Sequence, residues 1–117
     1  MKCVVIFKHD SHYPNPIEFR HGDYVNIGRQ DDEFPGWIWV TTDDGNQGWA
    51  PIQYLRIDDS DKTAIAIQDY TARELNTTSG ELLKLHFELN GWGWVENQNN
   101  ECGWVPMQSL KRMDTSD

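Results

Sequence analysis

The chain alternates apolar and polar residues over short runs that are broken by glycine, asparagine and aspartate. Tyr24-Val25-Asn26-Ile27 and Trp37-Ile38-Trp39-Val40 are two such runs, and Asp43-Asp44-Gly45-Asn46 has the composition of a tight turn between strands. Alternation at period two is typical of β-strands with one buried face, and no stretch shows a helical period. The pattern therefore predicts an all-β fold in which Ile38 and Val40 point into a core.

The second half of the chain repeats the first. Gly36-Trp37-Ile38-Trp39-Val40 returns as Gly91-Trp92-Gly93-Trp94-Val95, and Gly48-Trp49-Ala50-Pro51 returns as Gly103-Trp104-Val105-Pro106. A repeat of this kind indicates duplicated structural units. Each copy has too few residues for a β-sandwich, so a small closed barrel is the economical way to protect its sheet edges.

The repeat also sets the expected domain boundaries. We predict a first barrel over residues 1–57, a polar linker over 58–62, a second barrel over 63–112 and a short tail over 113–117.

Charge and composition narrow the classes of partner. The chain has 10 basic and 19 acidic residues, a formal net charge of −9, and this charge would repel a phosphate backbone or an anionic membrane. The apolar run Val4-Val5-Ile6-Phe7 is shorter than a signal-peptide core of about 7 to 15 residues. Cys3 and Cys102 are too few for a disulfide scaffold. We expect a cytoplasmic monomer with reduced cysteines and no nucleic-acid or membrane partner.

Six tryptophans occupy positions that match between the two copies. Alternation would turn Trp37 and Trp39 away from the core side of Ile38 and Val40. Three interpretations follow: packing in the core, an exposed groove, or packing against the linker or the other barrel. The tryptophans are Trp37, Trp39, Trp49, Trp92, Trp94 and Trp104.

The order of these motifs resembles the Src homology 3 (SH3) domain. The second copy opens with Ala66-Ile67-Gln68-Asp69-Tyr70 and continues with Gly80-Glu81, Trp92 and Gly103-Trp104-Val105-Pro106. The first copy offers Val5-Ile6-Phe7-Lys8-His9, Gly22-Asp23, Trp37 and Gly48-Trp49-Ala50-Pro51 at the same points. The resemblance covers nearly the whole of both copies, and it implies two tandem five-stranded SH3-like barrels.

The resemblance also implies a groove that binds left-handed polyproline helices between aromatic rings. Carried over position by position, the groove of the first copy would consist of Phe7, His9, Trp37, Trp49, Pro51 and Tyr54. The matching groove of the second copy contains Tyr70, Trp92, Trp104 and Pro106, but Gln68 and Ser109 replace two of its aromatic walls. The sequence therefore favours the first copy as the peptide-binding one.

Acidic residues add a second feature of the expected groove. In SH3 domains an acidic residue of the long first loop pairs with an arginine of the ligand; the second copy has Glu74 there, and the first copy has Pro16. Asp31, Asp32 and Glu33 lie in the loop before Trp37. They are either a substitute site for a basic ligand or a solvated loop.

The remaining chemistry is sparse. His9, His12, His21 and His86 have no cysteine or carboxylate at a recognisable metal-binding spacing, so we expect no metal site and no cofactor. No nucleophile motif, phosphate-binding glycine loop or carboxylate pair appears, and we expect no enzymatic activity. Two functions remain open. One is a module that binds proline-rich, extended or basic peptide segments, and the other is an acidic inhibitor or immunity-type protein that binds a basic partner through a broad surface.

Overall fold

A computed structural model describes residues 1–60 and 62–113 of the chain. Within these residues the fold is built from β-strands and two single-turn 3-10 helices, η1 (Ile52–Tyr54) and η2 (Met107–Ser109). The all-β prediction is confirmed. Ile38 and Val40 are 2% and 0% exposed, so the alternation along their strand identified the core-facing side correctly.

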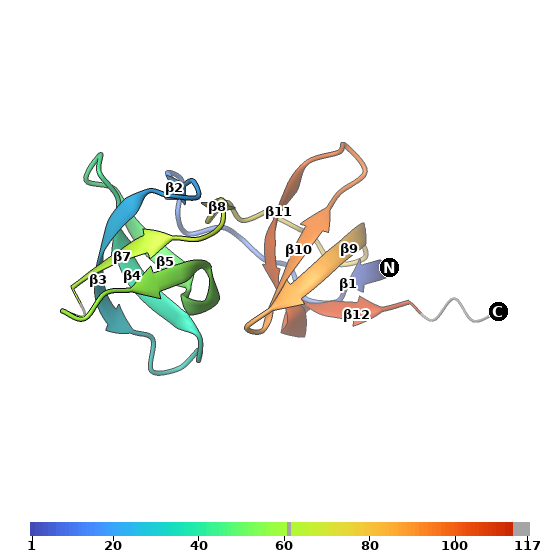
Figure 1. The fold of residues 1–117 in the computed structure, drawn as a ribbon. Helices are drawn as coiled ribbons and strands as arrows, with labels where there is room; N and C mark the ends of the chain where they lie inside the picture. Colours follow the sequence, from blue (N-terminus) through green and yellow to red (C-terminus); the bar gives the residue numbers. More distant parts are fainter. Residues whose placement is uncertain (61, 114–117) are drawn as a thin grey trace. The chain divides into compact units, whose positions relative to one another are not determined.

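Two antiparallel five-stranded sheets carry most of the structure (Figure 1). The first sheet has the order β11-β10-β9-β1-β12. Its strands are β1 (Lys2–Val5), β9 (Leu82–Leu89), β10 (Trp92–Glu96), β11 (Cys102–Pro106) and β12 (Leu110–Arg112).

The second sheet has the order β5-β4-β3-β7-β6, and a two-stranded sheet pairs β2 with β8. The strands of these two sheets are β2 (Glu18–Phe19), β3 (Tyr24–Gln30), β4 (Trp37–Thr41), β5 (Gln47–Pro51), β6 (Leu55–Ile57), β7 (Thr63–Ala66) and β8 (Tyr70–Thr71).

The two repeats exchange their first strands. β1 belongs to the first repeat but pairs with β9 and β12 of the second, and β7 belongs to the second repeat but pairs with β3 and β6 of the first. In Figure 1 the blue strand β1 accordingly lies beside the orange and red strands, and the yellow-green strand β7 beside the blue-green ones. The chain divides into unit 1, residues 1–14 and 74–117, and unit 2, residues 15–73.

This division corrects the predicted boundaries at 57 and 63. Unit 2 is one continuous segment in which the first strand of the fold, β7, follows β6 instead of preceding β2. Unit 1 is the same fold with unit 2 inserted into its first long loop. Chain termini of small domains often lie close enough for such permutations and insertions.

The predicted linker is the physical reason for the exchange. Residues 58–62 connect β6 to β7 as a hairpin turn inside unit 2, with Asp61 outside the described residues. The Asp58 carboxylate accepts hydrogen bonds from the backbone N–H of Ser60, at 2.9 Å, and from the hydroxyl of Thr63. Asp58 N–H also donates to the Thr63 carbonyl at 3.0 Å. Because this turn keeps β7 against β6, the first strand of unit 1 has to come from β1.

The register of β1 against β9 is fixed by backbone hydrogen bonds. The amino group of Met1 donates to the Leu85 carbonyl at 3.2 Å, and the Leu85 N–H donates to the Met1 carbonyl at 2.6 Å. Val4 lies opposite Leu82 on the same ladder. Since hydrogen-bonded and non-hydrogen-bonded pairs alternate in an antiparallel ladder, Val4 and Leu82 form a non-hydrogen-bonded pair.

The predicted turn Asp43-Asp44-Gly45-Asn46 connects β4 to β5. Gly45 has φ +84°, a left-handed conformation that favours glycine. The Asp44 carboxylate accepts hydrogen bonds from the Thr42 hydroxyl at 2.5 Å and from the Asn46 N–H at 3.1 Å. These two bonds lower the pKa of Asp44, because they stabilise its charged form.

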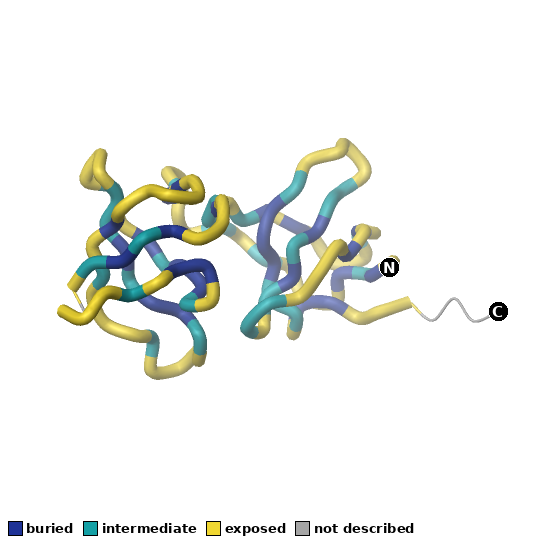
Figure 2. The backbone as a smooth tube through the Cα atoms, in the orientation of Figure 1, coloured by how far each residue is buried: buried dark blue, intermediate teal, exposed yellow. Residues whose placement is uncertain are grey.

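Each unit has its own core, and the cores follow the exchange. Figure 2 shows buried stretches along the strands and exposed residues in most of the turns. The core of unit 1 contains Cys3, Val5, Leu75, Leu83, Leu85, Val95, Val105 and Leu110. The buried apolar residues of unit 2 include Ile17, Phe19, Val25, Ile38, Val40, Ala50, Leu55, Ala64 and Ala66.

The sizes of the exchanged side chains match the unit that receives them. β7 contributes only alanines, Ala64 and Ala66, to unit 2, which contains the large residues Phe19 and Ile38. β1 contributes Cys3 and Val5 to unit 1, whose matching positions hold the smaller Thr77 and Gly93. Protein cores are close-packed, so this arrangement avoids overpacking in unit 2 and a cavity in unit 1.

Two further sequence expectations concern cysteine and the membrane. Cys3 is buried, Cys102 is half-buried, and both thiols are free. Burial raises the pKa of the Cys3 thiol, and the positive charges of Arg112 and the N-terminal amino group act in the opposite direction. Among the described residues there is no helix with the length and apolarity that crossing a membrane requires.

Candidate functional site

The strand exchange divides the predicted first-copy groove between the two units. Phe7 and His9 lie in unit 1, whereas Trp37, Trp49, Pro51 and Tyr54 lie in unit 2. The residues predicted for the second copy divide in the same way. Tyr70 lies in unit 2, and Glu74, Trp92, Trp104 and Pro106 lie in unit 1.

His9 is the centre of a cluster in unit 1. Two backbone hydrogen bonds fix its position: the His9 N–H donates to the Thr77 carbonyl at 3.2 Å, and the Thr77 N–H donates to the His9 carbonyl at 2.8 Å. Its ring stands nearly perpendicular to that of Trp92, with 5.6 Å between ring centroids. Nε2 of His9 lies 2.7 Å from Oε1 of Glu74, and both side chains are nearly buried. His9 therefore joins an aromatic ring and a carboxylate that come from the other repeat.

Glu74 is held in place by strand β11. It forms a bridge with Trp104, and the next residue, Leu75, donates its N–H to the Trp104 carbonyl at 3.2 Å. A Cβ atom at Gly103 would lie 3.1 Å from the Glu74 carbonyl carbon and 2.9 Å from Cγ of Leu75. Glycine at position 103 thus permits the close approach that positions Glu74.

Phe7 and Pro106 also belong to unit 1. Phe7 is 64% exposed, and its backbone N–H, like that of Ile6, donates to the Ser109 carbonyl. Pro106 lies directly opposite Trp92 in the sheet, and both are half-buried. We call Phe7, His9, Glu74, Trp92 and Pro106 the unit 1 aromatic surface.

The equivalent cluster of unit 2 is covered. The rings of Tyr54 and Tyr70 meet edge to face at 5.8 Å, and the Tyr70 hydroxyl donates to the Trp49 carbonyl at 2.9 Å. Trp37 lies opposite Pro51, which is buried. Trp37, Tyr54 and Tyr70 are only 6–8% exposed. The expectation of an open groove at Trp37 is therefore wrong.

Burial also affects the titration of Tyr54. Removal from water raises the pKa of its hydroxyl, and a hydrogen bond with the side chain of Gln68 offsets part of the rise.

Trp49 makes its contacts with a different set of residues. Its ring packs edge-on against Trp39 at 5.1 Å, and the guanidinium of Arg29 lies 5.1 Å from its ring centroid. A cation over an aromatic face is a stabilising contact at the protein surface. In unit 1 the corresponding Trp104 packs edge-on against Trp94 at 5.3 Å and against Phe87 at 5.6 Å.

The acidic loop of unit 2 has an internal role for one of its members. The Asp31 carboxylate accepts hydrogen bonds from the backbone N–H groups of Glu33, at 2.8 Å, and Phe34, at 3.2 Å. Asp32 and Glu33 are exposed. Asp31 thus shapes the loop, and Asp32 and Glu33 remain accessible at the surface.

Sequence reasoning missed the contact of His9 with Trp92 because it assigned them to different barrels. The signal that was available is the length of segment 58–62. A polar stretch this short between two strands is typical of a hairpin turn, and a hairpin at this point requires the exchange.

Comparison with known proteins supports the resemblance for the first half of the chain. Residues 2–58 match the model of the variant SH3 domain. The SH3 domain-containing protein Dlish of Drosophila melanogaster is 25% identical over 59 residues, which cover 50% of this chain and 16% of Dlish. The chain thus aligns with only a small part of that relative. No solved structure matches the chain.

The matched segment follows the order of the motifs along the chain. Its first strand, β1, lies in unit 1, and the rest of it, from residue 15, lies in unit 2. An SH3 domain indicates a protein–protein interaction module, and such modules are typically not catalytic.

Proposed function

We propose that the protein is an interaction module that binds an extended segment of another protein on the unit 1 aromatic surface. One observation carries the proposal: Phe7 is 64% exposed, whereas Trp37, Tyr54 and Tyr70 of unit 2 are at most 8% exposed. An aromatic ring contributes to binding only where a ligand can reach it. The proposal therefore moves the binding site from Trp37, which the sequence favoured, to Trp92 and Phe7.

A proline-rich segment suits this surface. A polyproline II helix exposes flat rings and is already ordered before binding, so it loses little conformational entropy. Trp92 and Pro106 are cross-strand partners, and the ring of Trp92 packs nearly perpendicular to that of His9. A ring held in place in this way loses little rotational freedom when a ligand packs on it.

Charge favours a ligand that also carries lysine or arginine. The chain has a net charge of −9, which attracts basic segments and accelerates their association. The carboxylate of Glu74 belongs to the surface itself, although His9 already occupies one of its oxygens. Added salt should weaken such binding by screening the attraction.

The test is a titration of labelled proline-rich peptides, with and without arginine, followed by fluorescence anisotropy. Phe7→Ala and Trp92→Ala should each weaken binding about thirtyfold or more, because loss of a central aromatic contact costs about 2 kcal/mol or more. Gln68→Ala is the matched control, since Gln68 occupies the position of Phe7 in unit 2, and it should leave the affinity unchanged. Circular dichroism should confirm that each variant is folded.

Two results would contradict the proposal. One is unchanged affinity in folded Phe7→Ala and Trp92→Ala variants. The other is loss of binding in the Gln68→Ala control, which would assign the ligand to unit 2.

A further inference from the structure

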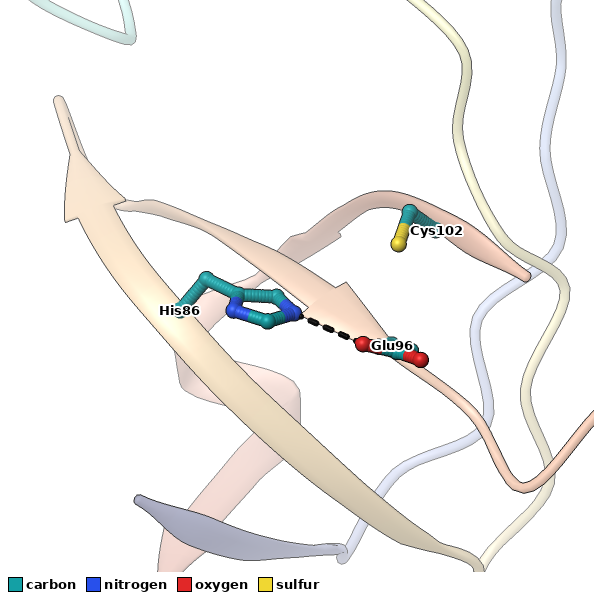
Figure 3. A group of neighbouring side chains, drawn as sticks. All are labelled: His86, Glu96 and Cys102. Atoms are coloured by element: carbon teal, nitrogen blue, oxygen red, sulfur yellow. Dashed lines mark hydrogen bonds and ion pairs between the residues drawn. The ribbon is translucent and has the colours of Figure 1, made fainter. Parts of the chain in front are cut away.

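We propose that His86, Glu96 and Cys102 form a binding site for a thiophilic divalent metal ion of the Zn²⁺ class. The three side chains come from adjacent strands of unit 1: His86 from β9, Glu96 from β10 and Cys102 from β11. Each offers one donor atom, and the three donor atoms lie within 4.8 Å of one another. Figure 3 shows the imidazole, carboxylate and thiol converging over the sheet.

Strand register brings two of the three donors together. Glu96 and Cys102 are direct cross-strand partners, so their side chains lie on the same face of the sheet. On the other side of β10, Lys84 of β9 lies opposite Glu96. A regular ladder would therefore place Lys84, and not His86, next to Glu96.

A β-bulge supplies the third donor. Leu85 pairs with Val95 and Phe87 pairs with Trp94, which leaves His86 as the extra residue between two consecutive pairs. A bulge redirects the side chain of its extra residue and is common next to functional sites. Here it places Nε2 of His86 at 2.9 Å from Oε1 of Glu96.

The donor set fits zinc chemistry. Zn²⁺ binds thiolate sulfur at about 2.3 Å and imidazole nitrogen or carboxylate oxygen at about 2.0–2.2 Å, so tetrahedral ligands stand roughly 3.3–3.7 Å apart. The present separations of up to 4.8 Å need shifts of about 1 Å, and the side chains of His86 and Glu96 are 34% and 27% exposed, which leaves them room to rotate. Three protein ligands leave a fourth position for water or a partner's side chain.

Charge in the site also suits a divalent cation. A thiolate, a carboxylate and a neutral imidazole together carry two negative charges, which equal the charge of the ion. Two further charged residues are close in the chain or the sheet. Lys84 lies opposite Glu96, and Glu101 accepts a hydrogen bond from the Asn97 side chain at 2.9 Å. Lys84 and Glu101 carry opposite charges, so together they leave the net charge around the three donors unchanged.

The fold does not require these three residues. The matching positions of the first repeat are Gly28, Thr41 and Gln47, and there Gln47 donates a neutral hydrogen bond to the Thr41 hydroxyl at 3.3 Å. The bulge itself recurs in β3, where the register shifts between Ile27 and Gln30. The donors are thus an addition to one copy of a shared framework.

The sequence prediction of no metal site is revised by this geometry. His86 was considered there, but its intervals to Glu96 and Cys102 match no metal-binding motif. The three ligands come from different strands, and a bulge that cannot be seen in the spacing selects one of them.

The experiment uses Co²⁺ as a spectroscopic probe on the full, reduced chain in the absence of peptide. Tetrahedral Co²⁺ with a thiolate ligand gives intense visible d–d bands and a sulfur-to-metal charge-transfer band. We expect both bands to saturate at one ion per chain, and Zn²⁺ to abolish them by displacement. Cys102→Ser should remove the charge-transfer band. His86→Gln and Glu96→Gln should weaken binding at least about tenfold, since even outer-shell changes have effects of this size.

Cys3→Ala is the matched control, because Cys3 is the other free thiol. It should leave the bands and the stoichiometry unchanged, and circular dichroism should show that every variant is folded. Absence of the charge-transfer band in the unmodified chain, its survival in Cys102→Ser or its loss in Cys3→Ala would each overturn the proposal. Because no peptide is present, these outcomes are independent of the proposed interaction function.

Discussion

Swapping the sizes of two matched core residues, Val5 and Ala66, should show how strongly core packing depends on which first strand each unit contains. Val5 of β1 is 1% exposed in unit 1, and Ala66 of β7, at the matching position, is 1% exposed in unit 2. Val5→Ala removes two methyl groups, which amounts to about 1.6 kcal/mol of transfer free energy. The cavity that remains raises the loss of unfolding free energy to about 2–3 kcal/mol.

Ala66→Val should also destabilise the protein, by overpacking. The two added methyl groups have to fit beside the buried side chains of unit 2, which include Phe19 and Ile38. Overpacking of a filled core costs about 1–3 kcal/mol. Urea titration followed by tryptophan fluorescence measures both losses, since each unit contains three tryptophans at matched positions.

The double variant Val5→Ala with Ala66→Val tests whether the two strands stay in the units that the structure shows. Because the turn at residues 58–62 keeps β7 in unit 2, the strands cannot return to their own repeats, and the cavity at position 5 and the overpacking at position 66 lie in different units. We therefore expect the double variant to lose about the sum of the two single losses. Neutral single variants would refute the size-matching argument, and a double variant clearly more stable than this sum would show that the strands can return.

Three further predictions concern the units separately. Gly103→Ala should cost more stability than the matched Gly48→Ala in urea titration, because the added Cβ meets backbone atoms at 3.0–3.1 Å in the first case and only side-chain atoms, at 3.2 Å or more, in the second. Thr77→Val should raise the unfolding free energy by about 1 kcal/mol, because its buried hydroxyl has no hydrogen-bond partner among the described residues; an unchanged midpoint would contradict this. Fragment 15–73 should fold alone by circular dichroism and fragment 1–57 should not, whereas contiguous barrels would give the opposite result.

The features that depend on local sequence pattern were predicted correctly. Alternation identified the strands, and the burial of Ile38 and Val40 follows from it directly. The turn at Asp44 and Gly45 also forms as its composition indicates, because its hydrogen bonds are local. The order of motifs led to the SH3 domain that the comparison finds at residues 2–58.

The sequence did not show which repeat supplies the first strand of each unit. β1 and β7 have the same pattern, so each is compatible with either sheet, and the choice depends on the turn at residues 58–62 and on core volumes. That error carried over to the site, because it assigned His9 to Trp37 and not to Trp92. The burial of Trp37 could not be predicted either, since it depends on the whole tertiary structure.

The exchange itself is tested most directly by disulfide trapping of β1. In a background with Cys3→Ala and Cys102→Ser, Val4→Cys is combined either with Leu82→Cys or with Tyr24→Cys, the position in the first repeat that matches Leu82. Val4 and Leu82 face each other as a non-hydrogen-bonded pair, where Cα atoms are about 4.5 Å apart and a disulfide can form. We expect an intramolecular bridge in the Leu82→Cys protein and none in the Tyr24→Cys protein; the reverse result would show that β1 pairs within its own repeat.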